Sequence, residues 1–268
     1  MKIVKNINST NIITKNKMKK NILITGATSG IGKATAKLLA NGNYNLIITG
    51  RRKNKLEEIT EELSSNNLEI KSLTFDIRNK KEVEDAWNSL STEQQKIDVL
   101  INNSGLALGA DPIQDGDEND WEQMIDTNIK GVLNISKLVI PKMIEQKSGH
   151  IINLSSIAGK EVYATGNVYC ATKHAVDALT KGMRIDLLPH NIKVSSIAPG
   201  MVETEFSIVR YHGNKEKADN VYKGLTPLYA EDVAEAIEFM ITRPAHVNIN
   251  DMLIMPTRQA SSTYNYRD

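Results

Sequence analysis

The sequence is poor in cysteine, has no excess of either charge, and contains no long hydrophobic run. Cys170 is the only cysteine, so an internal disulfide cannot form, which fits a reducing compartment and makes a cytoplasmic location the default expectation. The 33 lysines and arginines balance 32 acidic residues, so we expect neither nucleic acid nor an anionic membrane as a partner. No stretch approaches the roughly 20 consecutive apolar residues that a membrane-spanning helix needs.

Metal-ligand patterns are also scarce. The five histidines form no ligand-spaced pair on a recognisable element, and a single cysteine is too few for the usual zinc sites. The acidic stretch from Asp111 to Glu122 mimics the spacing of a calcium loop, but Ile113 stands at its third ligand position. We therefore expect no metal site.

The first 20 residues differ in composition from the rest of the chain. They contain six lysines, no acidic residue, and isoleucines too scattered to form the apolar centre of a signal peptide. We expect residues 1–20 to be a disordered N-terminal extension, with a transit peptide or a translation start at Met18 as alternatives. The remaining length suits one large α/β unit, so we place a single domain at residues 21–268.

Short β-rich runs alternate with longer amphipathic runs along this domain. The alternation predicts a Rossmann-type doubly wound α/β fold, with helices on both faces of a seven-stranded parallel sheet. The predicted strands are Asn21–Thr25, Asn45–Thr49, Glu69–Thr74, Val99–Asn102, His150–Leu154, Lys193–Ala198 and Met252–Met255. In such sheets ligands bind beyond the carboxyl ends of the strands. The longest irregular segment, at about residues 200–227, is the expected substrate loop.

A glycine-rich turn follows the first predicted strand and opens a predicted helix. Its residues are Gly26, Ala27, Thr28, Ser29, Gly30, Ile31 and Gly32. Glycines at these positions let the backbone approach a pyrophosphate at the helix N-terminus. The spacing is GxxxGxG rather than the commoner GxGxxG. The turn therefore predicts a dinucleotide site, with a tight structural connection as the alternative.

Two arginines follow the second predicted strand, where many NAD enzymes carry an acid that binds the adenosine ribose. An acid there would repel a 2′-phosphate, whereas the guanidinium groups of Arg51 and Arg52 can bind it through paired hydrogen bonds. We therefore expect NADP rather than NAD as the cofactor. The alternative is that both arginines are solvated at the start of a helix.

Tyr169 and Lys173 stand four residues apart on a predicted helix, so they share one face. A free tyrosine titrates near 10, too high for a good base at neutral pH. An ammonium about 4 Å away would attract the phenolate by roughly 4 kcal/mol at an effective dielectric constant of about 20, equivalent to about three pKa units before desolvation. Ser155 and Ser156 follow the fifth predicted strand upstream, where a hydroxyl can hold a substrate carbonyl. The alternative is an unremarkable surface pair.

Four motifs in this order resemble those of the classical short-chain dehydrogenase/reductase family. They are the glycine turn, Asn102-Asn103-Ser104-Gly105, Ser156, and the pair of Tyr169 and Lys173. The resemblance implies hydride transfer in which Ser156 polarises the carbonyl and Tyr169 protonates its oxygen. It implies that Lys173 lowers the tyrosine pKa and binds the nicotinamide ribose, and that Asn128 bends a helix and anchors a water in a proton relay.

The resemblance also implies further cofactor contacts. Asp76 would contact adenine and Asn103 the adenosine ribose, while the segment holding the nicotinamide carboxamide contributes Pro199, Gly200, Val202 and Thr204. Ser104 departs from the alanine usual in the family, which puts its neighbouring contacts in doubt.

In finer detail, residues 48–52, 105–109, 120–131 and 202–211 resemble the NADP-dependent 3-hydroxy acid dehydrogenases, including the serine and L-allo-threonine dehydrogenases. This resemblance implies oxidation of small 3-hydroxy acids at C3, or the reverse reduction, by a homotetramer. Such a substrate carries a carboxylate, which a buried site must pair with a cation or several donors. Arg210 is our candidate for this substrate contact, with a solvated or subunit-bridging arginine as the alternative.

Other functions share these motifs. A 3-oxoacyl-carrier-protein reductase or a general carbonyl reductase would use the same scaffold, although the net charge of +1 offers no obvious basic patch for an acidic carrier protein. A dinucleotide-sensing binding protein is the non-enzyme alternative. It would not require the complete set of Asn128, Ser156, Tyr169 and Lys173.

Overall fold

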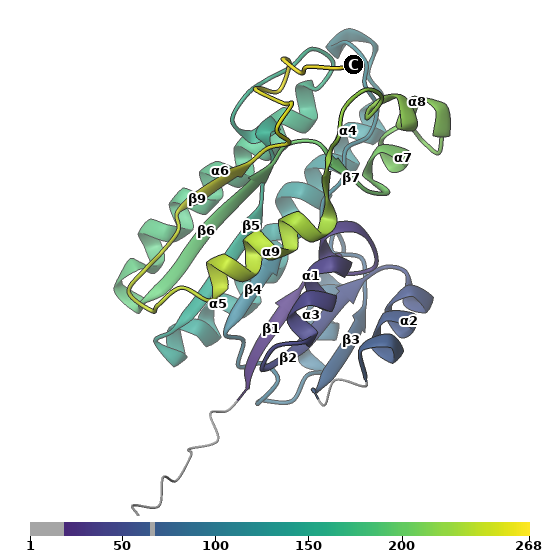
Figure 1. Cartoon of the computed structure of the whole chain (residues 1–268). Coiled ribbons are helices and arrows are strands. Elements are labelled where there is room, and N and C mark those ends of the chain that lie inside the picture. The colour runs from purple at the N-terminus through teal and green to yellow at the C-terminus, as the bar shows by residue number, and fades with distance from the viewer. Residues whose placement is uncertain (1–18, 65–67) are drawn as a thin grey trace, which may run out of the picture.

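A computed structural model describes residues 19–64 and 68–268, and its centre is a seven-stranded parallel sheet (Figure 1). The strands of this sheet are β1 (Lys20–Ile24), β2 (Tyr44–Gly50), β3 (Ile70–Thr74), β4 (Val99–Asn102), β5 (Gly149–Leu154), β6 (Ile192–Pro199) and β9 (Asp251–Ile254). Each predicted strand is present, with its ends within one residue of the prediction. The expected N-terminal extension lies outside the described residues, except for its last two.

The sheet order is β3-β2-β1-β4-β5-β6-β9, and every neighbouring pair is parallel. The chain therefore adds β2 and β3 on one side of β1, and then adds β4, β5, β6 and β9 on the other side. The order reverses between β1 and β4, which is the point where ligands bind in doubly wound sheets. The prediction of a Rossmann-type, single-domain α/β fold is confirmed.

Helices cover both faces of the sheet. Its helices are α1 (Gly30–Ala40), α2 (Lys53–Leu63), α3 (Lys80–Asn88), α5 (Gly131–Gln146), α6 (Asn167–Leu187) and α9 (Ala230–Ile241), with α4 (Glu118–Ile125) leading into α5. The apolar residues of α1, α2 and α9 pack in one cluster, and those of α3, α5 and the end of α6 pack in a second. The sheet is thus buried on both sides.

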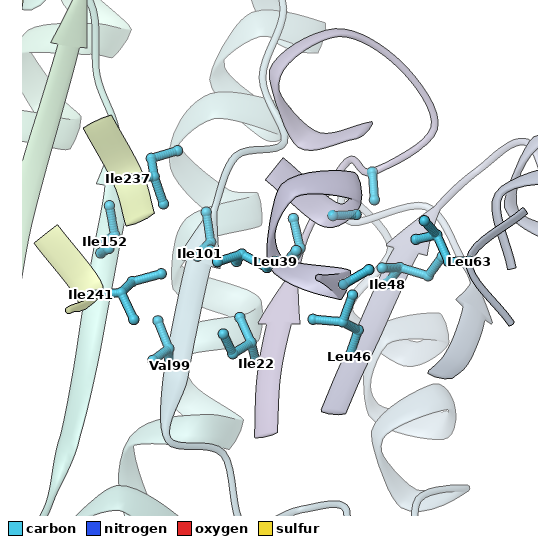
Figure 2. Packing of buried hydrophobic residues seen from close by; sticks show 14 of the residues in the cluster. Ile22, Leu39, Leu46, Ile48, Leu63, Val99, Ile101, Ile152, Ile237 and Ile241 are labelled. Carbon is cyan, nitrogen blue, oxygen red and sulfur yellow. The ribbon is translucent and has the colours of Figure 1, made fainter. Parts of the chain in front are cut away.

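Successive residues of a strand serve opposite faces, as the pleat requires. Ile22 of β1 packs in the first cluster, whereas the next residue, Leu23, packs in the second. Figure 2 shows the first cluster, where Leu39 of α1 and Ile237 of α9 lie over strand residues such as Ile101. This double burial explains the continuous apolar runs of β1, β4 and β5.

Smaller elements lie in the connections between strands and helices, most of them at the carboxyl edge of the sheet. They are the short helices η2 (Ile113–Asp115), η4 (Ile157–Gly159) and η5 (Leu188–His190), the π-helical turn η3 (Asp126–Lys130), the paired strands β7 (Val202–Glu203) and β8 (Leu228–Tyr229), and the helices α7 (Phe206–Arg210) and α8 (Lys215–Asn220). The segment 200–227, expected to be irregular, therefore contains a strand and two short helices. Their lengths are too small for a clear periodic signal.

No helix among residues 19–64 and 68–268 is long and apolar enough to cross a membrane.

Candidate active site

A groove of about 550 Å³ opens at the carboxyl edge of β1, β2 and β4. Its lining includes the predicted cofactor residues Gly26, Thr28, Ser29, Gly30, Ile31, Arg51, Arg52, Asp76, Asn103 and Thr204. The glycine turn shapes its floor, because Gly26 and Gly30 have φ of +68° and +51°, which side chains other than glycine rarely adopt. The structure thus brings residues from five separate sequence regions into one cleft.

The N-terminus of α1 faces this groove and contributes no acidic residue of its own. Ser29 is the N-cap residue, but its side chain makes no capping hydrogen bond, and the first turn of α1 contains no acidic residue. The first N–H groups of a helix have no partner within the helix and carry its positive dipole end. This end of α1 therefore fits a pyrophosphate.

Arg52 extends over the rim of the groove. Its guanidinium donates to Thr28 Oγ1 at 3.0 Å, to Ser29 Oγ at 2.7 Å and to Glu205 Oε2 at 2.9 Å. Arg51 lies beside it, 3.7 Å from Asp76, and the side chains of the two arginines are 55% and 44% exposed. Two adjacent, accessible guanidinium groups fit a terminal phosphate.

Asp76 accepts hydrogen bonds from Arg78, whose guanidinium contacts it at 2.7 Å. Burial acts to raise the pKa of Asp76, but the hydrogen bonds and charge of Arg78 outweigh it, so the pKa lies below its ordinary value. Asn103 Nδ2 donates to the carbonyls of Thr25 and Gly26, which ties β4 to the glycine turn.

Besides Tyr169 and Lys173, four predicted cofactor residues lie outside the lining of the groove, namely Gly32, Pro199, Gly200 and Val202. A Cβ on Gly32 would lie 2.4 Å from Asn103 Nδ2 and from the Gly26 carbonyl oxygen, and a Cβ on Gly200 would lie 2.3 Å from Gln259 Oε1. Pro199 pairs in register with Ile254 of β9. Packing therefore accounts for these positions, and their direct cofactor contacts stay predictions.

Ser156 and Tyr169 meet at the carboxyl end of β5. Ser156 caps η4, where its Oγ accepts a 3.1 Å hydrogen bond from the Ala158 amide, and its side chain is also hydrogen-bonded to the Tyr169 phenol. Tyr169 lies in the first turn of α6, is 8% exposed, and packs against Phe206 with ring centroids 5.7 Å apart. Ser155, in contrast, has a buried Oγ with no hydrogen-bond partner among the described residues. Of the two serines, Ser156 is the one that reaches the phenol.

Lys173 lies on the same face of α6, one turn further along. Its Nζ is 6.0 Å from the centroid of the Tyr169 ring and donates a 2.8 Å hydrogen bond to the Leu154 carbonyl. Burial lowers the pKa of Lys173 to about 8, and the charge of Asp177 acts in the opposite direction. Tyr169, Lys173 and Ser156 thus lie together at one buried end of the cleft.

The pKa of Tyr169 differs from the expectation. Burial raises this pKa above its ordinary value, and the charge of Tyr163 adds to the rise, while the Ser156 hydrogen bond and the charge of Arg210 oppose it. The sequence argument placed an ammonium about 4 Å from the phenol, where attraction would exceed desolvation. The predicted lowering is not found, because the phenol is almost completely buried and Lys173 is not among the charges that offset this burial.

Asn128 lies in the π-helical turn between α4 and α5. Its Oδ1 accepts from the Leu106 amide at 2.9 Å, and its Nδ2 donates to the Leu106 carbonyl at 2.8 Å and to Thr172 Oγ1 at 3.0 Å. A Cβ added to Gly105 would lie 3.3 Å from Asn128 Oδ1 and 3.4 Å from Lys173 Nζ. Asn128 therefore stands beside the lysine and fixes the loop after β4.

Comparison with known proteins agrees with this geometry. Residues 20–215 match the family described as short chain dehydrogenase. The chain belongs to this family.

The short-chain dehydrogenases that are similar to this chain are named after different substrates. "Sulfoacetaldehyde reductase 2" of Chromohalobacter salexigens is 45% identical over 91% of this chain and 96% of its own length. The "NADP-dependent 3-hydroxy acid dehydrogenase" of Schizosaccharomyces pombe is 44% identical over 92% and 96% of the two chains. The structure titled "The Closed form of serine dehydrogenase complexed with NADP+" has a TM-score of 0.86 and 42% identity, and covers 92% of this chain and 99% of that one.

Arg210, at the end of α7, borders the catalytic corner of this short-chain dehydrogenase. With Tyr169 it lines a crevice of about 10 Å³. Its guanidinium donates to Tyr163 Oη at 2.9 Å and to the Gly109 carbonyl at 3.1 Å. Across the described part of the chain, no acidic side chain forms an ion pair with Arg210.

Sequence reasoning missed Tyr163, Phe206 and Glu205. Tyr163 holds Arg210, Phe206 packs on Tyr169, and Glu205 pairs with Arg52 across the groove. None of the three belongs to a spacing pattern, although Phe206 and Glu205 lie inside the segment of closer resemblance. Among residues 19–64 and 68–268, no group of three or more His, Cys, Asp or Glu side chains could hold a metal ion.

Proposed function

We propose that the protein is an NADP-dependent oxidoreductase that oxidises the C3 hydroxyl of small 3-hydroxy acids, such as serine and L-allo-threonine, or reduces the corresponding carbonyls. The observation that carries the proposal is the Tyr169 phenol, which is hydrogen-bonded to Ser156 and lines one crevice with the cation Arg210. A substrate with a carbonyl next to an acid group needs a phenol to protonate the carbonyl oxygen, a second hydroxyl to hold that oxygen, and a cation to bind the acid group.

The groove residues support the choice of cofactor. The uncapped N-terminus of α1 would bind the pyrophosphate, and Arg51 and Arg52 would bind the adenosine 2′-phosphate. When bound, NADP supplies or accepts the hydride at its nicotinamide ring. Thr204, whose side chain closes over Gly30, would adjoin the carboxamide.

The catalytic residues divide the proton chemistry among them. Ser156 Oγ and Tyr169 Oη together hold the substrate oxygen, and the phenol gives its proton to that oxygen in reduction or takes one in oxidation. Lys173 places a positive charge beside the ring, where negative charge develops as the proton leaves. Asn128 holds the loop after β4 against this corner.

Arg210 would bind the acid group of the substrate. Its two side-chain hydrogen bonds go to neutral oxygens, so its charge is available to an anion. A sulfonate is also an anion of this kind, and the similarity to a sulfoacetaldehyde reductase makes a small sulfonated aldehyde the second candidate substrate. The crevice has room for about one water molecule, so we also propose that segment 200–227 moves to admit substrate.

The proposed reaction is tested by following the absorbance of reduced nicotinamide with purified protein. NADP and NAD are offered against serine, L-allo-threonine, 3-hydroxybutyrate and simple alcohols, and NADPH against sulfoacetaldehyde and uncharged ketones. We expect turnover with NADP and a small 3-hydroxy acid. Turnover confined to uncharged substrates would refute the acid preference, and no turnover with any substrate would refute the reaction.

The role of Arg210 has a separate test. Arg210→Met should reduce kcat/KM for serine much more than for an uncharged ketone, whereas Tyr163→Phe, which keeps the guanidinium, should have a smaller effect on both. Equal losses of Arg210→Met on the two substrates would refute recognition of the acid group.

We also propose a homotetramer in the cytoplasm. Exposed apolar side chains on β9 and the C-terminal segment, including Leu253, Tyr264 and Tyr266, support association, and the single buried Cys170 suits a reducing compartment. Light scattering on the purified protein would measure the mass, and a monomer would refute the assembly.

A further inference from the structure

Helix α6 carries a third buried polar residue that the proposed reaction does not use. Tyr169, Lys173 and Asp177 recur every four residues, so they share one face of the helix. Lys173 and Asp177 are each 5% exposed. A carboxylate buried this deeply needs partners, and those partners connect it to other elements.

Asp177 is held by a small charged network about two helical turns along α6 from Tyr169. Its carboxylate accepts from Lys160 Nζ and, at 3.2 Å, from Ser196 Oγ of β6. Lys160 follows η4 and also donates to Asp251 of β9 at 2.7 Å. Arg184, two turns further along α6, acts electrostatically with both carboxylates. One lysine thus joins the end of η4, helix α6 and strand β9.

Asp177 is the member of this network that acts on Lys173. Its hydrogen bond to the Leu154 carbonyl leaves its positive charge without an ion pair among the described residues. Burial disfavours the ammonium, and Asp177 is the charge that favours it. Lys160 forms an ion pair with the same carboxylate, so its own positive charge offsets part of that effect.

We propose that Asp177 is a positioning residue that keeps Lys173 in its ammonium form, and that Lys160 sets how much of the carboxylate's charge reaches it. The consequence for activity rests on the proposed function, in which Lys173 acts beside Tyr169. The charge network itself does not depend on that function. Asp177 touches neither substrate nor cofactor, so its effect passes through Lys173.

Two substitutions should change the titration of Lys173 in opposite directions. Asp177→Asn removes the favourable charge and leaves Lys160 in place, so the Lys173 pKa should fall. Lys160→Met leaves Asp177 charged and removes a cation, so the Lys173 pKa should rise. Each shift should be about one pH unit or somewhat less for a charge one helical turn away. A packing defect would not reverse sign between the two variants.

The direct measurement is the Lys173 titration in the protein without cofactor. NMR of side-chain ¹³Cε-labelled lysine, with Lys173→Met to assign the signal, gives its midpoint in each variant. Asp186→Asn is the matched control, because it removes an exposed carboxylate from the same helix, and it should leave the midpoint unchanged. Asp177→Glu keeps a carboxylate at this position, so its Lys173 midpoint should lie between that of Asp177→Asn and that of the unsubstituted protein. Thermal melting confirms that each variant is folded before its midpoint is compared.

The second measurement is the alkaline limb of kcat/KM for carbonyl reduction, which reports ionisations of the free enzyme. It should move down in pH for Asp177→Asn and up for Lys160→Met. Midpoints that stay fixed, or that move in the same direction in both variants, would overturn the inference. Retained reductase turnover in Lys173→Met would instead overturn the proposed function, even if the NMR midpoints moved as expected.

Discussion

The main groove and the buried face of α6 hold their charged groups in opposite ways. Arg51 and Arg52 at the rim of the groove are about half exposed, and their contacts are ion pairs and hydroxyl groups within reach of water. Tyr169 and Lys173 are almost completely buried, and burial is the largest influence on the pKa of each. Water screens charge at the rim, so single contacts there are weak, whereas each buried group depends strongly on its few neighbours.

The largest effect should follow removal of the buried phenol. Tyr169→Phe keeps the ring and its packing on Phe206 but loses the proton and the hydrogen bond to Ser156. We expect kcat to fall by about 10²- to 10⁴-fold, the usual contribution of a positioned acid or base. Cofactor affinity, measured by fluorescence titration, should stay within about twofold. Retained turnover would show that another group transfers the proton.

A buried group far from the cleft tests whether burial alone makes the properties of an ionisable group depend strongly on its surroundings. His150 of β5 is 4% exposed, and burial lowers its pKa from 6.5 to about 3. The unfolded chain therefore binds more protons between pH 6.5 and pH 3, so the free energy of unfolding should fall as pH decreases through this range, by an amount on the order of a few kcal/mol.

His150→Gln supplies the control for this prediction, since its amide can still reach Ser195, which contacts His150 Nε2 at 2.8 Å. Urea unfolding at several pH values should give a smaller pH dependence for the variant. Identical dependence in both proteins would mean that carboxylates alone account for the loss of stability in acid.

At the rim, the effect of one residue should be smaller and specific to the cofactor. Arg52→Met removes charge-assisted hydrogen bonds worth roughly 1.5–3 kcal/mol, so KM for NADPH should rise by about 10- to 100-fold. KM for NADH should change little, because that molecule lacks the 2′-phosphate. Lys53→Met, which removes a neighbouring, mostly exposed cation, is the control and should have little effect on either cofactor.

The smallest effect concerns the acid that pairs with this arginine. Glu205→Gln removes the ion pair with Arg52, so the guanidinium no longer exchanges a carboxylate for a phosphate. Because an exposed pair contributes about 1 kcal/mol or less, KM for NADPH should fall by about two- to fivefold. A rise in KM would mean that Glu205 instead holds Arg52 in its binding position.

Local patterns predicted the sheet well, and they also predicted that Tyr169 and Lys173 lie on one face of a helix. Each strand is a short apolar run between turn residues, and Tyr169 and Lys173 are joined by helical spacing, so both could be predicted from neighbours in the sequence. Asp177 stands at the same spacing, but its partners Lys160 and Ser196, and Asp251, which shares Lys160 with it, come from three other parts of the chain. The network that fixes its role therefore has no signature in the sequence.

The pKa of Tyr169 shows a second limit of sequence reasoning. Spacing predicted that a cation lies near the phenol, but the degree of burial depends on Phe206 and on the segment that covers the cleft. The same reasoning could not find the contact between Arg210 and Tyr163, which lie 47 residues apart. The size of a pKa shift caused by burial can therefore be judged only from the packed structure.

The π-helical turn at Asp126–Lys130 constrains the evolution of this protein. It contributes one extra residue to an otherwise continuous pair of helices. Deleting that residue would regularise the helix but rotate everything after it by about 100°, which would turn Val132, Ile135 and Val139 away from the sheet. The π-helical turn presents the Asn128 amide, and the apolar face of α5 faces the sheet only while that turn is kept. The two features can therefore be inherited only together.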